Sequence, residues 1–150
     1  MHETSFRIWQ PGDCENWVCQ NDGLAVGVNA GIDIGEQQIW SSASSLVLFS
    51  LDGKVYEFNQ KGKSDWEAYV GRPLVKLDVV TVQVDLTRAL PVVKFAVNGA
   101  FGRQIIMQLP NEKINQLRFI VETFAKEAAI EIIWFQLCYL LLFFNFLNLD

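Results

Sequence analysis

Apolar and polar residues alternate most regularly between residues 78 and 102. The alternation runs through residues 79–86, stops at a short connection and resumes through residues 93–97. A period of two residues is typical of a half-buried β-strand. Asn98-Gly99, a pair that tolerates positive φ, ends the second strand, and Phe101-Gly102 follows at once. The pattern predicts two antiparallel strands, a tight turn and the start of a third strand.

The same period predicts further strands on both sides of this region. They cover Phe6–Gln10, Leu24–Asn29, Leu46–Leu51, Val55–Phe58 and Gln104–Leu109, with Trp17–Cys19 as an additional candidate. Asp52-Gly53 predicts a hairpin between two of these strands, because both residue types accept positive φ. Gly27, inside a strand, predicts either a close approach of two backbones or a bulge. Residues 31–45 and 59–64 are polar and are expected to form surface loops.

Two patterns compete between residues 112 and 134. Helical spacing relates Ile114, Leu117, Val121, Phe124 and Ala128, and the Ala and Glu content also favours a helix from Glu112 onward. Strand spacing relates Leu117, Phe119 and Val121, and then Ile130, Ile132 and Trp134, around a turn at residues 124–127. The residues alone leave both interpretations open.

A strand ending in Asp85-Leu86, a short connector, and an apolar strand closed by Asn98-Gly99 with a second glycine at Gly102 together resemble the signature of SPRY domains. Residues 26–28 resemble the early strand of that family, and residues 45–49 and 52–56 resemble its central hairpin. These segments occur in the family's order and cover about residues 6–134.

The SPRY resemblance implies an all-β fold, an antiparallel β-sandwich of the concanavalin-like, SPRY-type jelly-roll class. It implies one SPRY-like domain at residues 5–134, followed by an apolar C-terminal tail at residues 135–150. Because SPRY domains typically close with a hairpin, the resemblance also favours two strands over a helix between residues 112 and 134.

Composition narrows the class of partner. The chain has 12 Lys and Arg against 17 Asp and Glu, a net charge of −5, and its few basic residues are scattered, so we expect no nucleic-acid partner. Hydrophobic residues make up 51% of the chain, which indicates a packed domain. No apolar run of signal-peptide length occurs near the N-terminus, and a cytoplasmic location is expected. Cys14, Cys19 and Cys138 are odd in number and form no C-x-x-C pair, which favours reduced thiols over disulfides or a metal site.

The residues that enzymes most often use are scarce. His2 is the only histidine and lies at a terminus expected to fray, and the nucleotide-binding glycine motifs are absent, so neither an enzyme nor a cofactor is predicted. One carboxylate pair, Asp33 and Glu36, resembles the acidic strand of glucanases with a similar two-sheet fold. However, Gly31 stands where the first Glu of that motif would be, and a separation of three points the two acids to opposite faces of a strand. We expect both to be solvated.

Residues 132–149 contain no charged residue and are rich in Leu and Phe. This run is barely long enough to cross a bilayer as a helix, and if Ile132–Trp134 belong to the sheet the remainder is too short. We expect residues 135–149 to form a helix or extended tail that packs on the domain or on a second copy. A tail anchor, or a tail not native to the domain, are the other interpretations.

The SPRY resemblance implies a non-catalytic module that recognises a peptide or protein surface through loops at one edge of the sandwich, as an adaptor does. Such surfaces depend on aromatic and Arg anchors. The loop candidates for partner binding are Trp66 and Tyr69, followed by Arg72, Trp17 and Trp40, and core packing is the competing role for each. Two alternatives remain: a carbohydrate-binding or glucanase-like sandwich, and a tail-anchored membrane protein whose SPRY-like domain faces the cytosol.

Overall fold

The computed structural model describes residues 1–10, 23–31, 44–59, 62–68, 70, 72–109, 111–123, 129–136 and 142–146; at 10, 62–68, 123, 134–136 and 142–146 only the backbone is described. The strands in chain order are β1 (His2–Gln10), β2 (Leu24–Asn29), β3 (Ser44–Phe49), β4 (Lys54–Asn59), β5 (Gly62–Ala68), β6 (Val79–Asp85), β7 (Val92–Val97), β8 (Ala100–Phe101), β9 (Ile105–Ile106), β10 (Arg118–Thr123), β11 (Ala129–Gln136) and β12 (Leu142–Phe146). One 3-10 helix, η2 (Asn111–Gln116), precedes β10.

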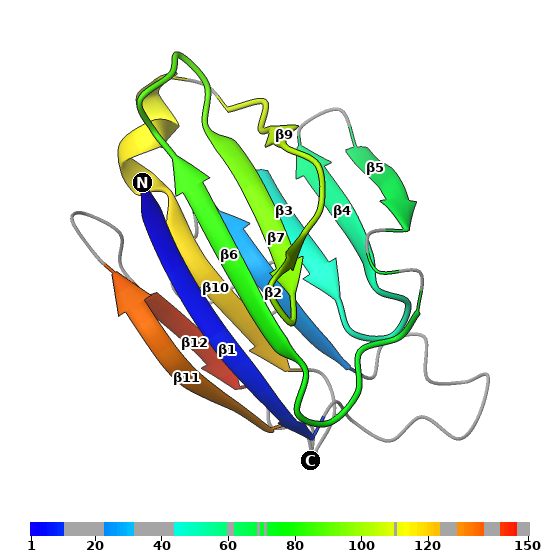
Figure 1. The fold of residues 1–150 in the computed structure, drawn as a ribbon. Coiled ribbons are helices and arrows are strands. Elements are labelled where there is room, and N and C mark those ends of the chain that lie inside the picture. Colours follow the sequence, from blue (N-terminus) through cyan, green and yellow to red (C-terminus); the bar gives the residue numbers. More distant parts are fainter. Residues whose placement is uncertain are drawn as a thin grey trace.

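These strands form two sheets that pack face to face as an all-β sandwich (Figure 1). The first sheet has the order β11-β1-β6-β7-β8, with β9 also paired to β7, and the second has the order β12-β10-β2-β3-β4-β5. The pairings are antiparallel except that of β10 with β12, which is parallel. The predicted all-β class with antiparallel sheets is confirmed.

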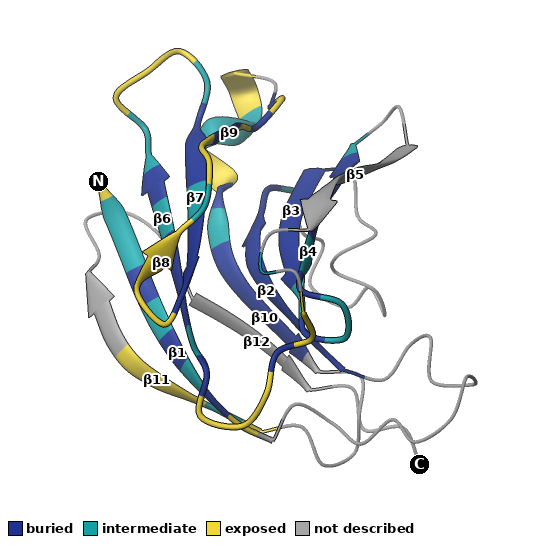
Figure 2. Cartoon of the chain, turned by 45° about the vertical axis from the view of Figure 1, so that its right-hand side comes forward, coloured by how far each residue is buried: buried dark blue, intermediate teal, exposed yellow. Residues whose placement is uncertain are grey.

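A single apolar core lies between the sheets, and the period-two pattern explains its composition. Alternate residues of both sheets belong to this core. Figure 2 shows β2 and β3 buried along almost their whole length. Phe6 and Ile8 of β1, Phe95 of β7 and Phe119 of β10 are among the largest side chains with no exposed surface. The alternating apolar residues at 80–84 and 93–97 are in this core, and Leu86 packs against it partly buried, because side chains two apart on a strand share a face.

The other face of the second sheet carries a smaller apolar cluster. It consists of Ala25, Val47, Tyr56, Phe58 and Ile120, with Phe49 partly buried against it. These residues alternate with the core residues on the same strands. The Phe49 and Tyr56 rings meet edge to face with centroids 5.1 Å apart, a geometry that aromatic pairs prefer.

The predicted turns and the predicted close approach are confirmed. Asn98 and Gly99 have φ values of 52° and 80°, and Gly53 has a φ of 65° in the β3–β4 hairpin. A Cβ atom on Gly27 would overlap the backbone carbonyl of Leu46 in the neighbouring strand, so this glycine marks a close approach of two backbones.

Three sequence predictions are corrected. Residues 62–64, expected in a loop, belong to β5, because this segment pairs with β4 even though its residues do not alternate. Trp66 therefore lies on an edge strand. His2 begins β1 and is paired with Val84, so the N-terminus is held in the first sheet.

The third correction concerns residues 112–134, where the two predicted strands exist but do not form a hairpin. β10 pairs with β2 and β12 in the second sheet, whereas β11 pairs with β1 in the first. Among the described residues of this segment, helical structure is confined to residues 111–116, as η2. The chain thus crosses between the sheets after β10.

The region predicted as strand Gln104–Leu109 pairs with β7 only at Ile105–Ile106. The alternation still predicts orientation, since Ile105, Met107 and Leu109 are buried while Ile106 and Gln108 are exposed.

The apolar C-terminal region contributes to both sheets. β11 continues to Gln136, two residues past the expected end of the domain, and β12 adds Leu142–Phe146 to the second sheet beside β10. Among the described residues, no helix has the length and apolar character needed to span a membrane. The division into a domain and a tail stays a prediction.

Candidate functional site

The structure describes few of the residues that the sequence singled out. Trp17, Trp40 and Tyr69 lie outside the described residues, as do the carboxylate pair Asp33 and Glu36 and all three cysteines. For Trp66 only the backbone is described, on β5. Arg72 is the one predicted partner-binding residue whose side chain can be placed. The described residues contain no cluster of three or more His, Cys, Asp or Glu suited to a metal ion.

Arg72 begins a connection, residues 72–78, that leads from the second sheet to the first. On the second sheet's side, the Leu74 amide donates to the Ser50 carbonyl at 2.8 Å, in the β3–β4 turn. On the first sheet's side, the Leu77 amide donates to the Ile8 carbonyl at 2.6 Å, and the Ile8 amide donates to the Asp78 carbonyl at 2.8 Å. Leu74 itself is buried in the core. The connection is therefore attached to both sheets at one end of the sandwich.

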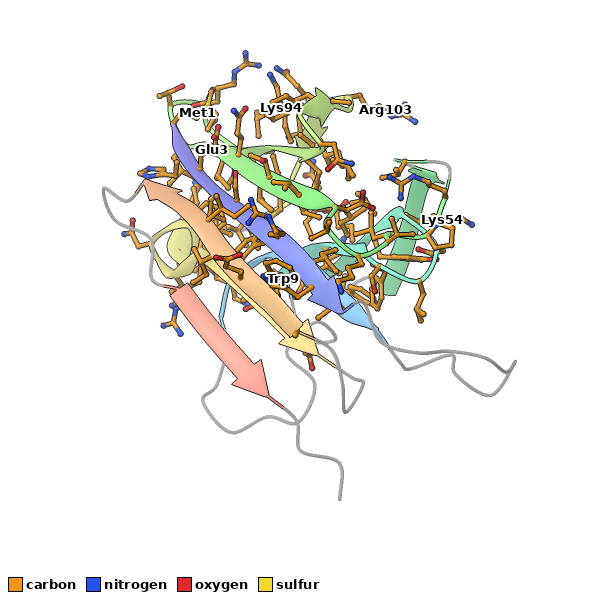
Figure 3. The ribbon with its side chains drawn as sticks, turned by 60° about the horizontal axis from the view of Figure 1, so that its bottom comes forward. Met1, Glu3, Trp9, Lys54, Lys94 and Arg103 are labelled. Atoms are coloured by element: carbon orange, nitrogen blue, oxygen red, sulfur yellow. The ribbon has the colours of Figure 1, made fainter. Side chains whose placement is uncertain are left out.

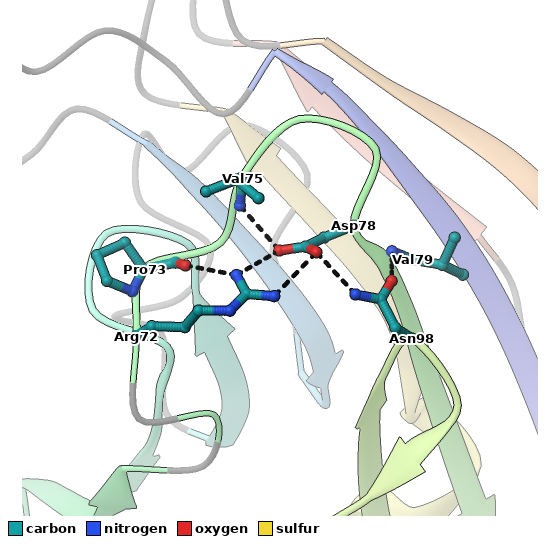
Figure 4. A network of polar contacts seen from close by, with 6 residues as sticks. All are labelled: Arg72, Pro73, Val75, Asp78, Val79 and Asn98. Carbon is teal, nitrogen blue, oxygen red and sulfur yellow. Dashed lines mark hydrogen bonds and ion pairs between the residues drawn. The ribbon is translucent and has the colours of Figure 1, made fainter.

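A buried carboxylate organises this connection (Figure 4). Arg72 donates to both Asp78 oxygens, from Nη1 at 2.7 Å and from Nη2 at 3.0 Å. The Val75 amide and the Asn98 Nδ2 also donate to Asp78, each at 2.8 Å. Asn98 in turn accepts from the Val79 amide at 2.9 Å. Four donors thus satisfy one carboxylate and tie the connection to the β7–β8 turn.

The electrostatics of this pair keep both groups charged. Burial of Asp78 on its own raises its pKa, but the hydrogen bonds from Arg72, Val75 and Asn98 and the Arg72 charge outweigh burial and hold the pKa below its usual range. The hydrogen bond to Asp78 raises the pKa of Arg72, against a smaller effect of desolvation. Only 5% of the Asp78 side chain is exposed, against 43% of Arg72. The arrangement suits a structural ion pair whose arginine side chain is partly exposed.

The turn held by Asp78 displays two apolar side chains. Val75 is 52% exposed and Leu77 is 54% exposed. The Asp78 amide donates to the Val75 carbonyl at 3.1 Å, which closes a four-residue turn with Leu77 in its third position. Leu77 has a φ of 71° there, a conformation that glycine or asparagine adopts readily and that is strained for leucine.

A third exposed apolar residue, Trp9, comes from the adjoining end of β1. Trp9 follows Ile8, to which Leu77 is hydrogen-bonded, and it lies at a register shift between β1 and β11. Its indole Nε1 donates to Glu131 at 2.9 Å, and the Arg7 guanidinium lies 5.8 Å from the ring centroid. Trp9 is 41% exposed. Figure 3 shows it on β1. Bulges commonly redirect a side chain in this way.

We call the set of Trp9, Val75, Lys76 and Leu77 the end surface. Its apolar side chains sit on backbone fixed by hydrogen bonds to both sheets, so they are presented at little further cost in conformational entropy. Such preorganised apolar and aromatic groups are the means by which proteins bind one another.

No protein-family model matches the chain, and neither the curated proteins nor the solved structures contain a significant match to it.

Sequence reasoning did not single out Trp9, Val75 or Leu77. The segment Arg72–Asp78 offered one signal, two apolar residues separated by Lys76 just before an alternating strand. Nothing local marks Leu77 for positive φ, because that conformation is usually announced by glycine or asparagine.

Proposed function

We propose that this protein is a non-catalytic interaction module, a cytoplasmic adaptor of the SPRY-like jelly-roll type, that recognises a peptide or protein surface through loops at one end of its sandwich. The two-sheet all-β fold and the position of the end surface, on the 72–78 connection and the adjoining end of β1, support this function. The residues proposed to contact the partner are those of the end surface, in place of Trp66 and Tyr69. Arg72 supports that surface through Asp78.

The conformation of Leu77 is the observation that carries the proposal. A leucine with φ of 71° costs backbone strain of order 1 kcal/mol, and 54% exposure of its side chain forgoes much of the stability that burying a leucine provides. The same position could hold asparagine with less strain. A strained and exposed apolar residue on a rigid loop points to a role in binding.

The test substitutes Leu77→Asn and compares binding with stability. We expect the free energy of unfolding of the variant to be equal to that of the unaltered chain or higher by up to about 1 kcal/mol, because asparagine tolerates positive φ. A urea titration measures this difference. We also expect the variant to lose most of the partners that the intact chain captures from a cell lysate, measured by quantitative mass spectrometry.

Ile106→Asn is the matched control, since Ile106 is 50% exposed but lies on β9, outside the end surface. It should leave the captured partners unchanged. Equal capture by the Leu77→Asn chain and the unaltered chain would show that the end surface is not the recognition surface.

A further inference from the structure

The charges around the end surface suggest what kind of partner it accepts. Lys76 is exposed between Val75 and Leu77, and in the described part of the chain no acidic side chain forms an ion pair with it. Arg7 is paired with Glu131 at 3.3 Å, and both are exposed, so that pair adds no net charge.

The Arg72–Asp78 pair adds to this imbalance in a less obvious way. The two charges cancel, but the Asp78 side chain is 5% exposed and the Arg72 side chain is 43% exposed, so the cation is the more accessible member of the pair. Among the described residues, this end therefore presents the exposed cations Lys76 and Arg72 together with three exposed apolar side chains. The chain as a whole has the opposite sign, with a net charge of −5.

We propose that the end surface binds an acidic, apolar segment of another protein, in which an Asp or Glu lies beside two apolar residues. The apolar residues contact Trp9, Val75 and Leu77, and the carboxylate lies near Lys76 and Arg72, where charge complementarity sets specificity and association rate. This inference rests on the proposed function and adds the chemistry of the partner.

The number of cations favours a protein segment over an anionic membrane. Lipid surfaces attract clusters of about four to eight basic residues, whereas the described residues here offer Lys76 of the end surface and Arg72 next to it. A peptide carboxylate flanked by apolar groups matches two cations flanked by apolar groups better than an anionic lipid surface does.

The experiment selects random peptides displayed on phage against the intact chain and against the variant Lys76→Glu. For the intact chain we expect enrichment of peptides with Asp or Glu next to apolar residues. For Lys76→Glu we expect the acidic preference to disappear and Lys or Arg to be enriched instead. A selected peptide should also bind the intact chain several-fold more weakly when the ionic strength rises from about 0.05 to 0.5 M.

Lys94→Glu is the matched control, because Lys94 lies on β7, well away from Trp9 (Figure 3). It should keep the acidic preference of the unaltered chain. The salt dependence of a selected peptide with the intact chain gives the same information if Lys76→Glu does not fold.

The outcomes separate this inference from the function it rests on. Peptides that need Leu77 but show no acidic preference would overturn the partner chemistry and leave the interaction module standing. Peptides that bind the Leu77→Asn chain equally well would overturn both. Failure to enrich any peptide, or binding to phosphatidylserine vesicles that Leu77→Asn abolishes, would overturn the acidic-segment proposal.

Discussion

At the scale of single residues, Asp78 is the group on which the end surface depends most. Its carboxylate is almost completely buried and accepts hydrogen bonds from Arg72, Val75 and Asn98. Removing one member of a buried ion pair leaves the other member with a charge and hydrogen bonds that have no partner. This lowers the free energy of unfolding by more than the intact pair contributes to it.

Asp78→Asn should lower the free energy of unfolding by about 2–4 kcal/mol, because the amide cannot accept all four hydrogen bonds and leaves Arg72 without its counter-charge. Arg72→Gln should also lower the free energy of unfolding, because it leaves the Asp78 carboxylate, whose side chain is 5% exposed, without its cation. Urea titration of both variants at neutral pH measures these losses. Equal midpoints for Asp78→Asn and the unaltered chain would contradict the role given to this carboxylate.

The pH dependence of stability follows from the lowered pKa of Asp78. Because the pKa is lower in the folded chain than in the unfolded chain, folding favours the charged form, and this stabilisation is complete above the usual aspartate pKa of about 3.9. It is lost as the pH falls through the lower, folded value. The slope of unfolding free energy against pH below about 5 should therefore be shallower in Asp78→Asn.

Gly99 and Gly53 both have positive φ, and replacing each with alanine compares backbone strain alone with backbone strain plus a steric clash. Gly99 has open space where a Cβ would lie, whereas a Cβ on Gly53 would overlap the backbone carbonyl of Arg72. Gly99→Ala should cost about 1–2 kcal/mol from strain, and Gly53→Ala clearly more, because the clash would displace the connection that carries the end surface. Thermal unfolding of both variants measures this order. A smaller loss for Gly53→Ala would contradict the observed contact.

At the scale of elements, β12 protects an edge of the second sheet. It pairs with β10 over five residues, from Phe119↔Leu142 to Thr123↔Phe146. Without it, β10 would become an edge strand that offers unpaired backbone groups to other chains. Residues 142–146 of the apolar C-terminal run thus pack on the domain as a strand of the second sheet.

Deleting residues 137–150 should lower the free energy of unfolding by about 2–4 kcal/mol, since several backbone hydrogen bonds of about 1 kcal/mol each are lost. It should also increase aggregation, measured by light scattering. A chain deleted of residues 147–150 only, which keeps β12, is the control. A more soluble and equally stable 1–136 chain would favour the interpretation of this region as a separate tail.

At the scale of the whole molecule, the connection 72–78 and the shared core join the two sheets into one unit. Core residues from both sheets form one cluster. The Leu74 amide donates a hydrogen bond to Ser50 at the end of the second sheet, and the Leu77 amide donates to Ile8 in the first sheet. Two sheets that cannot separate without exposing the same core are expected to unfold together.

We expect tryptophan fluorescence and far-ultraviolet circular dichroism to give coincident urea transitions. The five tryptophans report local environments and the dichroism reports the sheets, so the two probes are independent. Separate transitions would mean that one sheet remains folded without the other.

Local residue patterns determined most strands and turns of this protein. Strict alternation at residues 79–86 and 93–97 predicted β6 and β7 with their inward faces, since neighbouring side chains on a strand point to opposite sides. Asn98-Gly99 and Gly53 determined turns because positive φ is a property of single residues.

Only the tertiary structure decided the pairing and the surface. β5 is a strand because β4 lies beside it, and β10 and β11 separate into different sheets although they are neighbours in sequence. Leu77 adopts positive φ because its amide donates to the Ile8 carbonyl and because Asn98 holds the neighbouring Asp78. These contacts join residues far apart in the chain, and no pattern of neighbouring residues encodes them.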